Sequence, residues 1–248
     1  MNYRELTVED RLAVRERPPG TAVFHQSWDK LLFMHWEIPV EALRAKIPNR
    51  LQIDTYEGKA YIAITPLTIW GARPAYTPPL PVLSRTHELN VRTYVYLDGV
   101  PGVWFFSLDA SNPLAVTAAR SLFSLPYYTA SQSLEEEDGN RIRFESSRMS
   151  EEAKFRAVWT IGDDLPQAEP GTLDFFLIER YCLYTADDKK KLYRCRILHQ
   201  PWRLQETKEL SEFESTMVEA NGLPTPKGEP LLHCGGPVDV DVWSLEEV

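Results

Sequence analysis

The sequence is short of cysteine and of positive charge. Its three cysteines, Cys182, Cys195 and Cys234, are widely spaced and form no CxxC pair, a pattern that indicates neither a disulfide framework nor a zinc knuckle. Lys and Arg number 27 against 36 Asp and Glu, which gives a formal net charge of -9. Because phosphate groups are bound by clustered positive charge, this balance argues against nucleic acid and against anionic membrane surfaces as partners.

Long apolar runs and common catalytic motifs are also missing. No stretch approaches the ~20 apolar residues that span a bilayer, and Met1 to Leu6 lack the apolar core of a signal peptide. We therefore expect a cytoplasmic protein with no membrane partner. HExxH and HxH spacings, a GxSxG elbow, a phosphate loop and a dinucleotide fingerprint are absent from the sequence, which predicts no metal and no cofactor.

The composition that is present is typical of a folded domain. Hydrophobic residues make up 43% of the 248 residues and charged residues 25%. Residues 1–20 are polar and end in Arg17-Pro18-Pro19-Gly20, which predicts a peripheral N-terminal arm. No linker divides residues 21–248. Alternating apolar patterns recur along this part, so we predict a single mainly β (α+β) domain of antiparallel strands with a few helices.

Three local patterns predict how parts of the chain are connected. Leu51–Thr55 and Ala60–Thr65 flank a polar turn and predict a β-hairpin. The pair Asn112-Pro113 is a strong helix start and predicts a helix over residues 114–123, with a small-residue side that permits close packing against a sheet. Apolar residues at helical spacing predict a second helix over residues 173–184.

Five prolines lie between Pro66 and Pro81. Proline removes a backbone donor and fixes φ, so neither a central strand nor a helix is expected in this segment. The segment is rich in Trp, Tyr and Arg as well. We interpret it as a long loop that serves either as a lid over a pocket or as surface packing.

The stretch from Glu88 to Val95 carries the most informative pattern. Its residues alternate, so that four polar side chains share one face of a strand and Leu89, Val91, Thr93 and Val95 share the other. The polar face consists of Glu88, Asn90, Arg92 and Tyr94. Acid, amide, guanidinium and phenol groups are costly to bury without partners. The alternation therefore predicts that this face forms one wall of a pocket.

Six motifs along the chain carry a resemblance to a known superfamily. They are Leu32-Phe33-Met34-His35-Trp36, Glu88-Leu89-Asn90-Val91-Arg92-Thr93-Tyr94-Val95, Phe106-Ser107-Leu108-Asp109-Ala110, Leu125-Pro126-Tyr127-Tyr128, Glu179-Arg180-Tyr181 and His199-Gln200-Pro201-Trp202. The central stretch resembles the acetoacetate decarboxylase-like superfamily, and the chain after Gly20 resembles its uncharacterised YqjF-like branch. The fold implied by this resemblance is an antiparallel β-barrel or double-sheet cone with a few outer helices and a central cavity.

The chain departs from the decarboxylase pattern at the reactive position. In the decarboxylases the corresponding segments read Gly-Arg-Glu and Pro-Lys-Lys, and one lysine forms a Schiff base while its neighbour depresses its pKa. Here the segments read Ala119-Arg120-Ser121 and Pro126-Tyr127-Tyr128. A phenol has no amine to condense with a carbonyl. We therefore predict that no Schiff base forms, although Glu88 falls near the decarboxylases' catalytic glutamate.

The remaining polar residues still have chemical roles to offer. Glu88 is a candidate general acid or base, and Arg92 and Arg120 are candidates to clamp a carboxylate. The candidate oxyanion donor is Tyr94, Tyr127 or Tyr128. The alternative is that Glu88 and Arg92 merely neutralise one another on the strand. The candidate substrate-binding residues are Asn90, Arg120, Tyr127, Tyr128, His35 and His199. A lone histidine at a strand end is more often a hydrogen-bonded structural residue than a metal ligand, and this alternative applies to both histidines.

Two classes of function follow from these observations. The first is a small-molecule-binding barrel that acts as a cofactor-independent enzyme on a small oxo- or hydroxy-acid, by lyase-like or isomerase-like acid/base chemistry. The second is a non-catalytic protein that binds or sequesters a small carboxylate or an apolar acid. In both, the expected partner is a small molecule, and a homodimer is compatible with the predicted edge strands.

Overall fold

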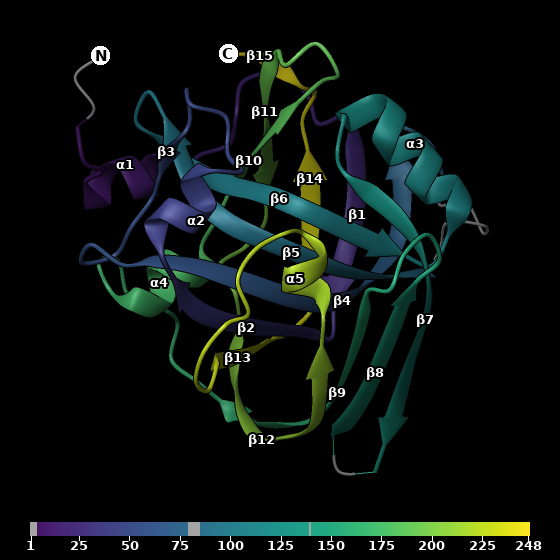
Figure 1. Cartoon of the computed structure of the whole chain (residues 1–248). Coiled ribbons are helices and arrows are strands. Elements are labelled where there is room, and N and C mark those ends of the chain that lie inside the picture. Colours follow the sequence, from purple (N-terminus) through teal and green to yellow (C-terminus); the bar gives the residue numbers. More distant parts are fainter. Residues whose placement is uncertain (1–3, 79–84, 139) are drawn as a thin grey trace.

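A computed structural model describes residues 4–78, 85–138 and 140–248, whose strands form one continuous sheet with short helices at its ends and sides (Figure 1). The strands are β1 (Phe24–Asp29), β2 (Leu31–Ile38), β3 (Gln52–Ile53), β4 (Ala60–Pro74), β5 (Arg85–Leu97), β6 (Val100–Ala110), β7 (Tyr127–Glu137), β8 (Arg141–Arg148), β9 (Lys154–Asp164), β10 (Cys182–Ala186), β11 (Leu192–Leu198), β12 (Leu204–Ser215), β13 (Leu231–Gly235), β14 (Val238–Val242) and β15 (Glu246–Glu247). The helices are α1 (Val8–Ala13), α2 (Val40–Arg44), α3 (Pro113–Phe123), α4 (Leu173–Ile178) and α5 (Met217–Ala220). The mainly β architecture predicted from the alternating patterns is confirmed.

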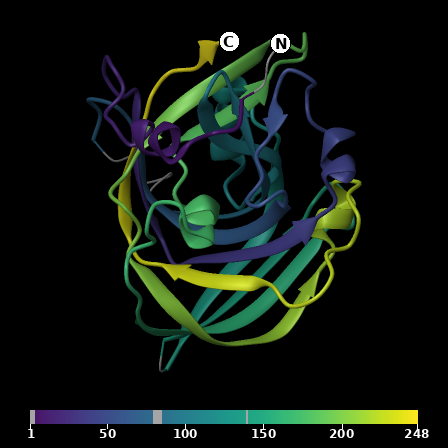
Figure 2. The same ribbon diagram turned by 90° about the vertical axis from the view of Figure 1, so that its left-hand side faces the viewer.

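The strands close into two rings that share β4, β5 and β6. The first ring runs β1-β14-β11-β10-β6-β5-β4 and returns to β1 through the β1–β4 pairing. The second ring runs β2-β13-β12-β9-β8-β7-β6-β5-β4 and returns to β2. Turned by 90°, the strands curve into a closed outline, and α4, at the left-hand end of the strands in Figure 1, is seen across it (Figure 2).

β5 is the wall between the two rings, and its alternation assigns each face to one of them. Leu89, Val91 and Val95 face the second ring, whose core also contains Phe144 and Trp159. Glu88, Asn90 and Arg92 face the first ring, where a cavity lies. The period of two in the sequence thus corresponds to two different interiors on either side of one strand.

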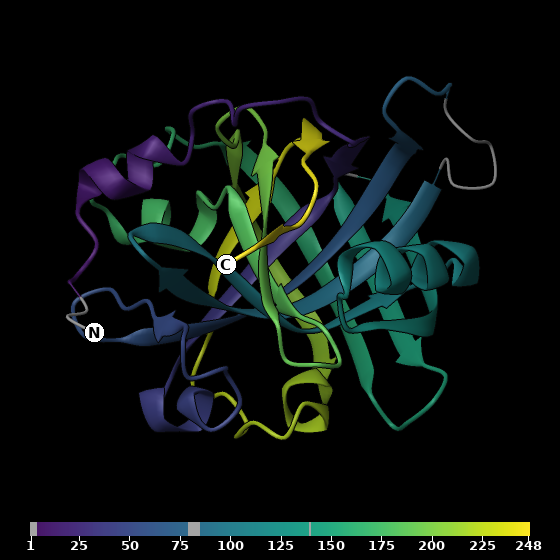
Figure 3. The ribbon, with the colours of Figure 1, turned by 90° about the horizontal axis from the view of Figure 1, so that it is seen from above.

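Two helices border the first ring at different places. Seen from above, α3 lies along one side of the strands, and α1 of the N-terminal arm lies on the far side (Figure 3). The α3 helix begins as its sequence predicts, because the Asn112 side chain accepts hydrogen bonds from the Leu114 and Ala115 backbone N–H groups and Pro113 occupies the first turn. In the described part of the chain, no helix has the length and apolar character needed to cross a membrane.

The prediction of a loop between Pro66 and Pro81 is wrong over residues 66–74. Residues 66–74 continue β4 instead of forming a loop, and Pro66 pairs with Leu89 of β5. On the other edge of β4, the pairing with β2 ends at Ile64 and the pairing with β1 begins at Thr68. Pro66 therefore lies between two partner strands, where a missing N–H group is tolerated. Of the predicted lid, residues 79–81 lie outside the described residues.

Two further connections differ from the predictions. The expected hairpin between residues 51–55 and 60–65 is wrong, because β3 pairs with β5 through Ile53 and Val95, and β4 pairs with β2 and β5. The helix predicted over residues 173–184 ends at Ile178, and the chain enters β10 at Cys182. In both cases a tertiary strand pairing overrides the local pattern.

Candidate functional site

A cavity of about 200 Å³ lies inside the first ring. Most of its wall is apolar, with side chains from several strands and from the end of α4: Phe24, Trp28, Leu31, Phe33, Leu67, Ile69, Val103, Phe105, Leu108, Ile178, Ile197 and Val242. The α3 helix adds the small side chains of Ala115, Ala118 and Ala119, together with Leu122. The small-residue side of this helix therefore borders the cavity.

The polar part of the wall is a row on β5. Glu88, Asn90 and Arg92 line the cavity and are only 5%, 5% and 9% exposed. Alternate residues of a strand are about 7 Å apart, so the Cα atoms of Glu88 and Arg92 are about 13 Å apart along the row. The row therefore extends from the α3 side of the cavity, where Glu88 pairs with Ala110 at the end of β6, toward α4.

Glu88 forms an acid pair with Tyr127. The Tyr127 hydroxyl donates to Glu88 Oε2 over 2.7 Å. Burial raises the pKa of Glu88 to about 7, although the hydrogen bonds from Tyr127 and Asn90 act in the opposite direction. Burial and the neighbouring Glu88 raise the pKa of Tyr127 well above its ordinary value. At neutral pH, Glu88 therefore exchanges a proton readily while Tyr127 stays a hydrogen-bond donor.

Arg92 is the cation of the row, and its guanidinium is incompletely partnered. Nε and Nη2 are buried, and neither donates a hydrogen bond to a described residue. The guanidinium carbon lies 5.4 Å from the centroid of the Phe33 ring, which also lines the cavity. A buried guanidinium with free donors is costly unless a ligand or water binds it, and a planar carboxylate fits its fork bidentately.

Two neighbouring polar atoms on the same wall are also unpartnered. Thr65 on β4 is the register partner of Asn90, and both residues line the cavity. Thr65 Oγ1 and Asn90 Oδ1 are buried without a hydrogen bond in the described part of the chain. Together with Arg92 they form a group of unsatisfied donors and acceptors on one apolar wall, which is the usual make-up of a small-molecule site.

His199 lines the cavity as part of an aromatic group. Its ring stacks on Tyr181 at 4.5 Å between centroids and lies 5.1 Å from Trp202. Nδ1 is 2.7 Å from the Gln200 carbonyl oxygen. Burial lowers the pKa of His199. The residue therefore contributes a neutral aromatic surface to the cavity wall.

Two predicted site residues are placed near α4 and outside the cavity wall. Tyr94 continues the β5 alternation, but its hydroxyl donates to the Leu177 carbonyl over 2.7 Å and its ring packs 5.2 Å from Phe176. His35 is fully buried, and its ring stacks near Phe33 at 6.2 Å. Burial lowers its pKa well below the ordinary histidine value. Neither residue is among those lining the cavity, because α4 covers this end of the row.

Arg120 and Tyr128 are also absent from the cavity wall. Arg120 is exposed on α3, whose Ala115, Ala118 and Ala119 line the cavity instead. Tyr128 follows Tyr127 on β7 and so points to the opposite face, where the Arg148 guanidinium carbon lies 3.8 Å from its ring centroid. Of the three tyrosines considered for the site, the structure brings only Tyr127 into hydrogen-bond contact with Glu88.

Arg180 and Thr65 line the cavity, although neither was predicted as a site residue from the sequence. Thr65 ends the alternating run 60–65, so its inward position follows from that pattern. Arg180 carries no such signal, because it lies in the short connection between α4 and β10. No lysine is among the residues that line the cavity, so the part of the wall that the structure describes offers no amine for a Schiff base.

The chain belongs to the DUF2071 family, described as an uncharacterized conserved protein, whose model matches residues 25–239. It is 40% identical over 231 residues to the uncharacterized protein YqjF of Bacillus subtilis (strain 168), and the match covers 93% of this chain and 94% of that protein. The predicted YqjF-like relationship is confirmed.

Solved structures with a similar fold are acetoacetate decarboxylase-like. The enduracididine biosynthesis enzyme MppR, solved with pyruvate, matches with a TM-score of 0.66 at 11% identity, covering 92% of this chain and 91% of that chain. Acetoacetate decarboxylase from Legionella pneumophila matches with a TM-score of 0.61 at 11% identity, covering 100% and 98%. The fold implied by the sequence motifs is confirmed by these likenesses.

Proposed function

We propose that the cavity of the first ring binds a carboxylic acid with an apolar chain, and that Arg92 holds the carboxylate. The observation that carries this proposal is the Arg92 guanidinium, which is 9% exposed, lines the cavity and keeps Nε and Nη2 free of protein partners within the described residues. A carboxylate supplies the two acceptor oxygens and the negative charge that this group lacks. The similar fold of MppR was solved with pyruvate, itself a carboxylate.

The rest of the wall fits the apolar part of such a ligand. Leu67, Phe105 and Leu122 are among the side chains that line the cavity, and transfer of each methylene from water to an apolar site contributes about 0.8 kcal/mol. A dry cavity of about 150 Å³ accommodates benzene, so the cavity here has room for a short alkyl chain. Affinity is therefore expected to rise with chain length until the cavity is full.

The test is the heat stability of the protein in the presence of straight-chain acids from acetate to octanoate. A ligand that binds only the folded state at 100 times its Kd stabilises it by about 2.7 kcal/mol. We expect the melting temperature to rise with chain length, and alcohols of equal length to have a smaller effect because they lack the charge. Arg92→Gln should abolish the difference between acid and alcohol.

Arg85→Gln is the matched control, since Arg85 lies on the same strand but is exposed beside Trp70. It should behave as the wild type does. An acid series that leaves the melting temperature unchanged at several pH values would contradict the proposal, as would a stabilisation that survives in Arg92→Gln.

A second candidate function is acid/base catalysis on the bound acid, and the Glu88–Tyr127 pair favours it. A carboxyl group with a pKa of about 7 is suited to transfer protons near neutral pH. Because Glu88 and Arg92 are four residues apart, the reacting carbon would lie several bonds from the carboxylate.

Deuterium exchange tests this second function. An acid with a carbonyl several carbons from its carboxylate, such as 4-oxopentanoate, should gain deuterium next to the carbonyl when incubated with the wild type in D2O and followed by NMR. Glu88→Gln should bind the acid and lose the exchange. Equal exchange in both proteins would leave a binding protein as the function.

A further inference from the structure

A second guanidinium, that of Arg180, borders the same cavity. Arg180 is 5% exposed and lies two residues after the end of α4. Its Nε donates to the Phe176 carbonyl over 2.9 Å, and its Nη1 donates to Asp54 Oδ2 over 2.8 Å. The third nitrogen, Nη2, is buried and without a hydrogen bond to any described residue. Two of three nitrogens thus fix the group in place, and the third remains free for a ligand.

Arg92 and Arg180 lie at the same end of the cavity. The Arg180 guanidinium carbon is 4.7 Å from the centroid of the Tyr94 ring. Burial raises the pKa of Tyr94, and the positive charges of Arg92 and Arg180 both oppose that increase, as expected when both guanidinium groups lie near one phenol. Glu88 is the one acidic residue on the described cavity wall, and it lies at the other end of the β5 row.

Asp54 is the one carboxylate paired with both Arg180 and Arg11 of the N-terminal arm, so it balances only one of their two positive charges. Arg11 of α1 binds Asp54 with two nitrogens, Nη1 to Oδ2 and Nη2 to Oδ1, each over 2.7 Å. Asp54 itself is 3% exposed. The Arg11, Asp54 and Arg180 side chains therefore carry a net charge of +1, and Arg92 brings the total to +2.

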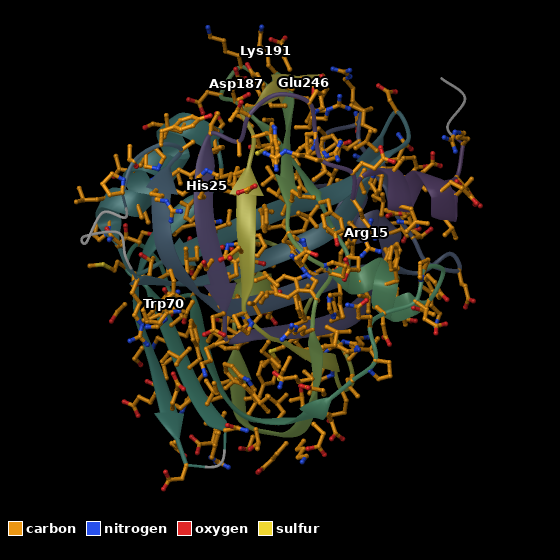
Figure 4. The ribbon with its side chains drawn as sticks, turned by 180° about the vertical axis from the view of Figure 1, so that it is seen from behind. Arg15, His25, Trp70, Asp187, Lys191 and Glu246 are labelled. Atoms are coloured by element: carbon orange, nitrogen blue, oxygen red, sulfur yellow. The ribbon has the colours of Figure 1, made fainter. Side chains whose placement is uncertain are left out.

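Glu179 and Arg15 lie nearby, and their opposite charges leave the net charge of +2 unchanged. Glu179 accepts hydrogen bonds from the Tyr181 hydroxyl and from the Trp202 backbone N–H. The Arg15 guanidinium carbon lies 5.9 Å from the same Tyr181 ring and 5.8 Å from Phe175 of α4. Figure 4 shows Arg15 of the arm beside α4. One negative and one positive charge thus offset each other beside Tyr181.

We infer that this end of the cavity binds a dianionic head group, held by Arg92 and Arg180 together, on an apolar chain. Two positive charges in a largely buried site are stabilised best by two negative charges with several acceptor oxygens. Two carboxylates on one carbon and a phosphate monoester both meet this description. The inference rests on the proposed function, since the same cavity binds the same part of the ligand, and it makes Arg180 a specificity-determining residue.

The test compares three ligands with the same heptyl chain: octanoate, heptylmalonate and heptyl phosphate, at a pH where the last two are dianions. Calorimetric titration should give at least one dianion a Kd about tenfold below that of octanoate, which corresponds to about 1.4 kcal/mol. A preference for malonate alone identifies a dicarboxylate ligand, and a preference for phosphate alone identifies a phosphate monoester.

Two variants and a control separate this inference from the proposed function. Arg180→Gln and Arg11→Gln should each reduce the preference for dianions to near equality, and Arg11→Gln should still bind octanoate because Arg11 does not line the cavity. Arg11 lies on the arm, outside the cavity, so its variant also covers the case in which Arg180→Gln fails to fold. Arg17→Gln removes an exposed arginine of the same arm and should keep the preference.

Equal binding of all three ligands by the wild type would overturn the inference, and so would a dianion preference that persists in both variants. In those cases octanoate binding through Arg92 still stands. If none of the three ligands binds, the proposed function fails and this inference fails with it.

Discussion

The two faces of β5 border interiors of different kinds. On the second-ring side, Leu89 and Val91 are fully buried and belong to the same core as Phe144 and Trp159, which are also fully buried. On the first-ring side, the alternate residues border a cavity of about 200 Å³. One strand therefore stabilises the fold with one set of side chains and presents a binding surface with the other.

The two interiors also differ in whether a buried guanidinium group has a carboxylate partner. Beside the second ring, the buried Arg148 guanidinium pairs with Asp109 over 2.8 Å, and Tyr128 covers its face. In the first ring, Arg92 has no carboxylate within salt-bridge distance in the described part of the chain. A buried charge without a partner costs stability, and proteins keep such groups where a ligand supplies the partner.

The comparison predicts that truncating an aromatic side chain lowers the free energy of unfolding more in the second ring of strands than in the first. Phe144→Ala should lower the free energy of unfolding by about 3–5 kcal/mol, because it opens a new void in a filled core. Phe105→Ala removes a half-buried ring that already borders a cavity, so we expect a loss below about 2 kcal/mol. Urea unfolding of both variants measures the difference, and equal losses would break the distinction between the two interiors.

Glu88, on the first-ring face of β5, should make the stability of the protein depend on pH. Its pKa of about 7 in the folded protein exceeds the ordinary value of 4.5, so the folded state binds more protons than the unfolded state between these values. Stability therefore falls as the pH rises through this range, and the contribution of Glu88 between pH 5 and pH 8 is about 2–3 kcal/mol.

Glu88→Gln should remove this part of the pH dependence and should be the more stable protein at pH 8. Urea unfolding at pH 5 and pH 8 measures this pH dependence. The matched control is Glu145→Gln, which removes an exposed carboxyl group on β8. A wild type and a Glu88→Gln variant with the same pH dependence would show that Glu88 ionises as an ordinary surface acid does.

The row of polar residues on β5 can be predicted from the sequence because it depends only on the pattern within one strand. A period of two is sufficient to place Glu88, Asn90 and Arg92 on one face, and the structure brings all three to the cavity. Tyr94 obeys the same period but is covered by α4, a helix 79 or more residues later in the chain. The alternation gives the face of a side chain and not what packs over it.

The second guanidinium could not be predicted for a related reason. Arg180, Asp54 and Arg11 come from three distant segments, and their contact depends on how α1 and α4 dock against the barrel. Pro66 shows the same limit at the level of the backbone. Its place in β4 is explained by the gap between the pairings of β1 and β2, and no pattern within residues 60–74 reveals that gap.

The most direct test of the central claim is a crystal structure of the protein grown with octanoate. We expect the carboxylate within hydrogen-bond distance of Arg92 Nε and Nη2, and the alkyl chain along the apolar wall toward α3. The same experiment with Arg92→Gln should show no ordered carboxylate at that position. Octanoate bound outside the first ring, or a cavity filled only by ordered water that satisfies Arg92, would contradict the assignment of this cavity as the acid-binding site.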